Sequence, residues 1–74
     1  MYKNPVDVIR ARMKRRGTPV YVIANATGIE YYRVYKSLSK GYNRPLLASE
    51  FIAICDFLEL TIADFIETEI NKEI

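Results

Sequence analysis

The chain has 74 residues, half of them apolar, and a formal net charge of +2 at pH 7. This length suits one domain with a single core. There is neither an apolar run long enough to cross a membrane nor an apolar block near the N-terminus resembling a signal peptide. With no histidine and Cys55 as the single cysteine, the sequence lacks a zinc ligand set, a Ser-His or Cys-His pair and an internal disulfide. We therefore expect a cytoplasmic protein that is not an enzyme and holds no metal or cofactor.

Charge is divided unevenly along the chain. Up to Arg44 there are ten basic and two acidic residues, a net charge of +8. From Pro45 onward one basic residue, Lys72, stands against seven acidic ones, a net charge of −6. Such segregation is typical of a protein in which one half meets a polyanion. The alternative, that the charges only solvate a small protein, fits a scattered mixture better.

The first helix is predicted to begin at Asn4 and Pro5, because asparagine caps helix N-termini and proline is favoured at the first helical position. Gly17 is expected to end it, behind a basic cluster that complements the helix dipole. Three apolar residues recur at helical spacing and should face the core: Val6, Ile9 and Met13.

The segment from Pro19 to Lys40 is predicted to form two short helices joined by a tight turn at Gly28, where glycine permits a positive φ. The first helix starts at Thr18-Pro19 and runs to Ala26 or Thr27, and the second begins near Glu30. The residues predicted to pack inward are Ile23, Ala24, Ile29, Val34 and Leu38. The opposite face of the second helix carries Tyr31, Tyr32, Tyr35, Lys36 and Ser39, and exposed aromatic residues at this density usually contact a partner.

Two further helices are expected in the C-terminal half. After Leu46 and Leu47 comes a segment so apolar that it predicts a central core helix, carrying Phe51, Ile52, Ile54, Cys55 and Leu58. Residues 61–64, Thr-Ile-Ala-Asp, are a variant of the capping box and predict a fifth helix with Ile62, Phe65 and Ile66. Ile70 and Ile74 continue an apolar stripe, which either covers the core of its own chain or pairs with a twin subunit.

Four residues form a spacing pattern across the turn: the small Ala24, then Gly28, the apolar Ile29 and the β-branched Val34. This pattern resembles the helix-turn-helix of the Cro and phage-repressor class (lambda repressor-like, XRE-type), and residues 51–65 resemble the end of that domain. The resemblance covers about residues 6–67. It implies an all-α, compact five-helix bundle with a helix-turn-helix. The whole chain, 1–74, would be a single domain with its core at about 5–67 and a helical tail at 68–74.

The resemblance also implies a function: a sequence-specific regulator of transcription, of phage or prophage type, that binds a double-stranded DNA operator as a homodimer through the major groove. By the family pattern, the base-reading positions are Glu30, Tyr31, Tyr32 and Lys36. Lysine can donate to guanine, and tyrosine rings can touch thymine methyl groups. Glu30 either accepts from a cytosine amino group or only caps and solvates the helix. The residues expected at the DNA backbone are Arg33, Tyr21, Tyr35, Lys40, Tyr42, Asn43 and Arg44.

An alternative is a protein-binding module that keeps the helix-turn-helix fold, such as a phage inhibitor of host defence or an antirepressor. Its partner would be held by the face of Tyr31, Tyr32 and Tyr35, because tyrosine clusters are common at protein interfaces. Val20 also stands where the family commonly has a polar residue that grips a phosphate. For Tyr35, packing within its own chain is a further possibility.

Overall fold

Four α-helices and one short 3-10 helix, η1, make up the part of the chain that the computed structural model describes, residues 3–66. The α-helices are α1 (Pro5–Arg16), α2 (Val20–Thr27), α3 (Tyr31–Leu38) and α4 (Ala48–Leu58), and η1 covers Ile62–Phe65. The prediction of an all-α fold is confirmed, and the prediction of five helices is wrong. The tail at 68–74, with Ile70 and Ile74, lies outside the described residues.

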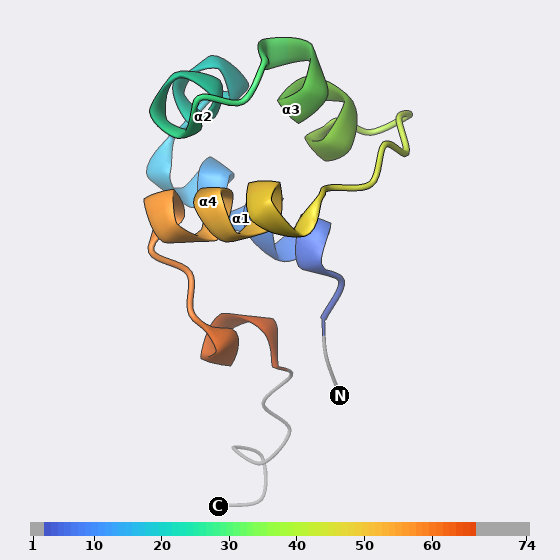
Figure 1. Cartoon of the computed structure of the whole chain (residues 1–74). Helices are drawn as coiled ribbons and strands as arrows, with labels where there is room; N and C mark the ends of the chain where they lie inside the picture. The colour runs from blue at the N-terminus through green and yellow to red at the C-terminus, as the bar shows by residue number, and fades with distance from the viewer. Residues whose placement is uncertain (1–2, 67–74) are drawn as a thin grey trace, which may run out of the picture.

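The helices form a compact arrangement of two layers. Figure 1 shows α2 and α3 side by side above α4 and α1, with η1 on the far side of α4 from α3. A long connection, residues 39–47, leaves the C-terminal end of α3 and returns to the start of α4 (Figure 1). Among residues 3–66, no helix lies against the outer side of α3.

Local signals set both ends of α1. The Asn4 Oδ1 accepts from the backbone N–H of Val6 at 3.0 Å and of Asp7 at 3.4 Å, as its capping role predicts. Gly17 ends the helix in the left-handed region, with φ +67°. For α2 the prediction was less accurate: Pro19 occupies the N-cap position, and no side chain, that of Thr18 included, caps the helix.

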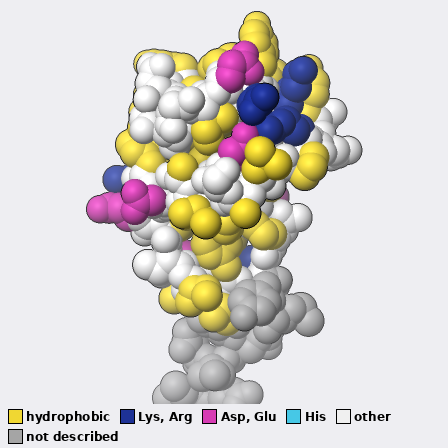
Figure 2. All heavy atoms as spheres, viewed as in Figure 1, with side chains coloured by type: hydrophobic (Ala, Val, Ile, Leu, Met, Phe, Trp, Pro, Cys, Tyr) yellow, Lys and Arg dark blue, Asp and Glu magenta, His cyan; other side chains and the backbone are white. Residues whose placement is uncertain are grey.

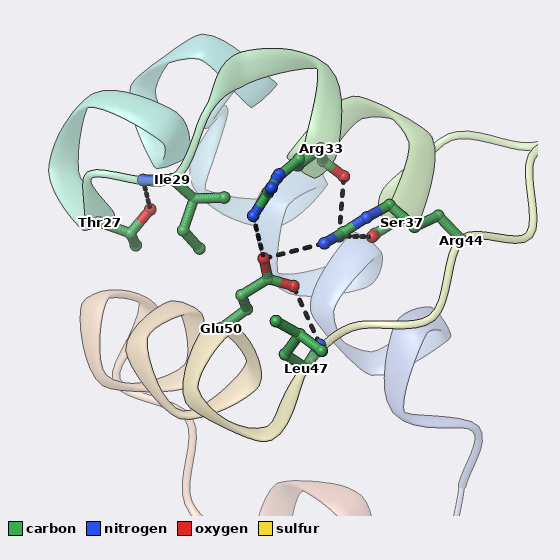
Figure 3. Close-up of polar contacts among 7 residues, drawn as sticks. All are labelled: Thr27, Ile29, Arg33, Ser37, Arg44, Leu47 and Glu50. Carbon is green, nitrogen blue, oxygen red and sulfur yellow. Dashed lines mark hydrogen bonds and ion pairs between the residues drawn. The ribbon is translucent and has the colours of Figure 1, made fainter.

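The connection between α2 and α3 is a short turn over residues 28–30. Gly28 adopts φ +78°, which a residue with a Cβ rarely takes up, and its N–H donates to the carbonyl of Ala24 at 2.9 Å. The Thr27 hydroxyl donates to the carbonyl of Ile23 at 2.7 Å. It also accepts from the N–H of Ile29 at 3.4 Å (Figure 3). These bonds fix the angle at which α3 leaves α2.

The core draws on all four α-helices, and its fully buried side chains are Ile9, Ile23, Val34, Ile54 and Leu58. Ala24 and Leu38 are also buried, and Ile29, Val6 and Met13 pack partly buried against this cluster, as their helical spacing predicts. Ile52 departs from the prediction: it lies on the outer side of α4 with 65% of its surface exposed. The apolar composition of α4 gave no means of distinguishing its two faces.

The expected fifth helix is a single 3-10 turn. Its predicted N-terminal contact is present, since the Asp64 carboxylate accepts from the Thr61 N–H at 2.7 Å and from the Thr61 hydroxyl at 3.2 Å. After Phe65 the backbone becomes extended at Ile66, with φ −100° and ψ 131°, so an α-helix does not propagate. Within residues 3–66, no helix has both the length and the apolar character that a membrane crossing requires.

Candidate nucleic-acid interface

The outward side of α3 is defined by what the helix buries. Val34, Ser37 and Leu38 face the core. Successive residues of an α-helix are rotated by about 100°, so Tyr32 and Lys36 point away from the core, and both are exposed. This helical geometry places two of the four predicted base-reading residues at the centre of the exposed face.

Aromatic rings occupy one flank of this face. Tyr31 and Tyr32 meet edge to face with ring centroids 5.3 Å apart, and Tyr31 stacks on Tyr35 at 6.1 Å. Tyr35 also contacts Tyr42 from the following loop, at 5.5 Å. The four rings, called here the tyrosine cluster, are therefore continuous. Tyr35 is half-buried between two of its neighbours, as its alternative role in intramolecular packing anticipates.

Basic residues occupy the opposite flank. Arg33 lies on the side of α3 away from Tyr35, and its side chain is 59% exposed. Lys36, at the centre of the face, borders this flank, and Lys40 is exposed just beyond the end of α3. Figure 2 shows lysine and arginine side chains gathered over α3 and the connection that follows it, with acidic side chains of the surface at their edge. The exposed face of α3 thus combines an aromatic flank with a cationic one.

A buried carboxylate lies beneath the cationic flank. Glu50, in the first turn of α4, is 6% exposed. Its Oε2 accepts from the Arg44 Nη2 at 3.0 Å and lies 4.0 Å from the Arg33 Nη1. Its Oε1 accepts from the backbone N–H of Leu47 at 2.9 Å (Figure 3). Leu47 has no polar side chain to return that contact, so the α4 cap is half of a capping box.

Arg44 is held by three acceptors on two helices. Besides Glu50, its Nη1 donates to the hydroxyl of the buried Ser37 at 2.8 Å and to the carbonyl of Arg33 at 3.4 Å. Both of these acceptors belong to α3, so Arg44 fastens the loop and α4 to that helix (Figure 3). The contact of Arg44 with the DNA backbone stays a prediction, and it is disfavoured because three of its five N–H donors are already used within the chain. The role of Glu50 was not predicted from the sequence, although an acid three residues after a helix N-cap is the signal that could have revealed it.

The remaining predicted residues lie apart from this network. Tyr21 is 58% exposed in the first turn of α2, on a different helix from the tyrosine cluster. Glu30 is exposed at the α3 N-cap position, but its side chain makes no capping hydrogen bond, so the capping part of its second alternative is wrong. Solvation of the helix end and the cytosine contact both stay open. In the loop, Tyr42 and Asn43 are exposed and line a hollow that also includes Arg10 of α1. Val20 packs against the core, so a phosphate contact from its side chain is excluded.

The described residues offer little to a metal or a nucleophilic reaction. Between residues 3 and 66 there is no group of three or more histidine, cysteine or acidic side chains placed to bind a metal ion. Cys55 is half-buried, and burial raises the pKa of its thiol above the ordinary value of 9.0, so its thiolate fraction at neutral pH is small.

The Glu50 contacts predict a dependence of stability on acid. The hydrogen bond from Arg44, and after it the bond from Leu47, hold the pKa of Glu50 below its ordinary 4.5 against the opposing effect of burial. The unfolded chain therefore takes up this proton at a higher pH than the folded protein does, so the stabilisation is complete above pH 4.5 and is lost as pH falls through the folded pKa.

We expect the free energy of unfolding to fall more steeply in the wild type than in E50Q as pH falls from about 5 to about 3. Urea unfolding followed by circular dichroism at each pH measures both slopes. Some acid dependence should persist in E50Q, because the backbone N–H of Thr61 lowers the pKa of Asp64 as well. Equal slopes in the two proteins would contradict a paired Glu50.

Comparisons with protein-family models, with curated proteins and with solved structures found no match for this chain. No relative therefore assigns a role to any residue of this surface.

Proposed function

We propose that this chain is a cytoplasmic, sequence-specific DNA-binding regulator of transcription, of the phage or prophage repressor type. It binds an operator in double-stranded DNA, with α2 and α3 acting as a helix-turn-helix and α3 lying in the major groove. The observation that carries the proposal is the exposed face of α3, with Tyr32 and Lys36 at its centre and cations along one flank.

The centre of the face has the chemistry of base readout. The Lys36 ammonium can donate to O6 and N7 of guanine, and the rings of Tyr31 and Tyr32 supply apolar edges for thymine methyl groups. Glu30, at the entry to α3, either accepts from a cytosine amino group or solvates the positive end of the helix dipole.

The surroundings of the face have the chemistry of backbone contact. Arg33 and Lys40 are exposed on and just beyond α3, and Asn43 is exposed in the loop. The backbone N–H groups at the start of α2 have no side-chain cap, and helix N-termini of this kind bind phosphate. A domain this small covers few base pairs, so we propose a homodimer on an inverted repeat whose half-sites lie about one DNA turn apart.

Selection from random duplex DNA by the purified protein tests the proposal. We expect an inverted repeat to be enriched, with one guanine position that depends on Lys36. In K36A the preference at that position should be lost, because a good lysine–guanine contact contributes about 1–3 kcal/mol of discrimination. K40A removes the same charge just beyond the end of α3 and should weaken binding to all sequences alike. Recovery of unrelated sequences by the wild type would refute operator recognition.

A second candidate function is the binding of a protein partner, and the tyrosine cluster is the observation that favours it. Four contiguous rings, of which Tyr32 is 60% exposed, resemble the aromatic centre of many protein interfaces. A phage inhibitor of host defence or an antirepressor would use the surface in this way. Under this hypothesis Y32A abolishes partner binding and high salt changes it little, whereas DNA binding is steeply salt-dependent.

A further inference from the structure

We infer that Glu50 is a positioning residue: its buried carboxylate holds the guanidinium of Arg33 at the edge of the α3 face, ready to contact a DNA phosphate, while Arg44 supports the pair from within. This inference rests on the proposed DNA-binding function. It assigns different roles to two arginines that the sequence alone treats as equivalent backbone contacts.

The number of donors in use separates the two arginines. A guanidinium has five N–H donors in a fixed planar fork. In Arg44, Nη1 serves Ser37 and the carbonyl of Arg33, and Nη2 serves Glu50. Its side chain is 24% exposed. Arg44 has few donors left for a ligand and little surface from which to offer them.

Arg33 is in the opposite condition. Among the described residues its guanidinium makes no hydrogen bond, and its nearest acidic atom is the Glu50 Oε2 at 4.0 Å, beyond hydrogen-bonding distance. The carboxylate therefore attracts and orients Arg33 without consuming its donors. A planar fork with free donors is the arrangement that contacts phosphate in a bidentate manner.

A carboxylate beneath a phosphate site needs an electrostatic explanation. Two guanidiniums surround Glu50, so the group of three carries a net charge of +1, and the negative charge lies on the buried side. Figure 3 shows Arg33 descending from α3 and Arg44 entering from the loop toward the same carboxylate. An arginine whose direction is fixed before binding loses less side-chain freedom when it contacts a phosphate.

The inference and simple charge counting predict opposite signs for one substitution. E50Q removes a negative charge near the DNA, which by charge counting alone strengthens binding. If Glu50 positions Arg33, E50Q instead weakens binding to every duplex by about fivefold, within the range of couplings measured between neighbouring groups. Fluorescence anisotropy with the selected operator and with an unrelated duplex measures both affinities.

A double-mutant cycle with R33A separates positioning from a general structural effect. In the R33A background E50Q should change DNA affinity little, because the residue that it positions is gone, whereas damage to the fold would weaken binding in both backgrounds. D64N is the matched control, since it also removes a carboxylate paired with an arginine, Arg12 at 3.3 Å, on the side of the molecule away from α3. E50D keeps the charge, shortens the side chain and should reproduce the loss if E50Q does not fold.

These measurements distinguish a failure of the positioning role of Glu50 from a failure of the proposed DNA-binding function. Weaker binding by E50Q or E50D that disappears in the R33A background supports the positioning role. Tighter or unchanged binding, or an equal loss in both backgrounds, overturns it and leaves the proposed function standing. A wild-type protein that binds neither duplex overturns the proposed function itself.

Discussion

Replacing Arg44 by alanine is expected to lower the free energy of unfolding by about 2–3 kcal/mol. Removing one partner of a buried ion pair leaves the other charge uncompensated, which costs about 3–5 kcal/mol for fully buried pairs. We take a smaller value because Arg44 retains 24% of its side-chain exposure. The substitution also deprives Ser37 of its donor and releases the loop from α3. Urea unfolding at neutral pH, followed by helical circular dichroism, measures the change.

R33A is the matched control for this prediction. It removes the same charge from the same carboxylate, but the 59% exposed Arg33 contributes little to stability, so the expected change is within about 0.5 kcal/mol. Equal destabilisation by R33A and R44A would show that the network is not organised as its distances indicate. R44A should also lose much of its acid-dependent stabilisation, because Arg44 is the main cause of the lowered pKa of Glu50.

Raising the salt concentration from about 50 to about 200 mM is expected to weaken operator binding by roughly 100-fold. Each subunit exposes two cations that we assign to phosphates, Arg33 and Lys40, so a dimer neutralises about four phosphates. Four neutralised phosphates release enough counterions to give an effect of this size. A plot of the logarithm of affinity against the logarithm of salt concentration measures the slope.

Two single substitutions refine this measurement. R33A should reduce the slope by about one for each subunit, with a similar loss of affinity for operator and unrelated DNA. R15A removes the same charge from α1, where Arg15 lines a hollow with Leu60 and Asp64, and should leave the slope nearly unchanged. If R15A lowers the slope as much as R33A does, the net charge of the protein alone determines DNA affinity, and α3 is not the contact surface. A flat salt dependence in the wild type would favour a protein partner held by the tyrosine cluster.

Much of the fold was predictable because its signals are local. Asn4 caps α1 through its own neighbours, Gly28 supplies the positive φ of the turn, and Val34 and Leu38 face inward because the α-helix repeats every 3.6 residues. The exposure of Tyr32 and Lys36 follows from the same period. Residues within one or two turns of each other determine these features, so the sequence by itself contains them.

The tertiary structure decided the features that join distant segments. Ser37, Arg44 and Glu50 belong to a helix, a loop and another helix, and only their packing separates the internal Arg44 from the exposed Arg33. It also decided which side of the apolar α4 is buried, leaving Ile52 outside, and it ended the expected fifth helix after one turn at Ile66. The periodicity of apolar residues predicts that a helix has an inner face. The segments that cover this face are determined by contacts between residues far apart in the chain.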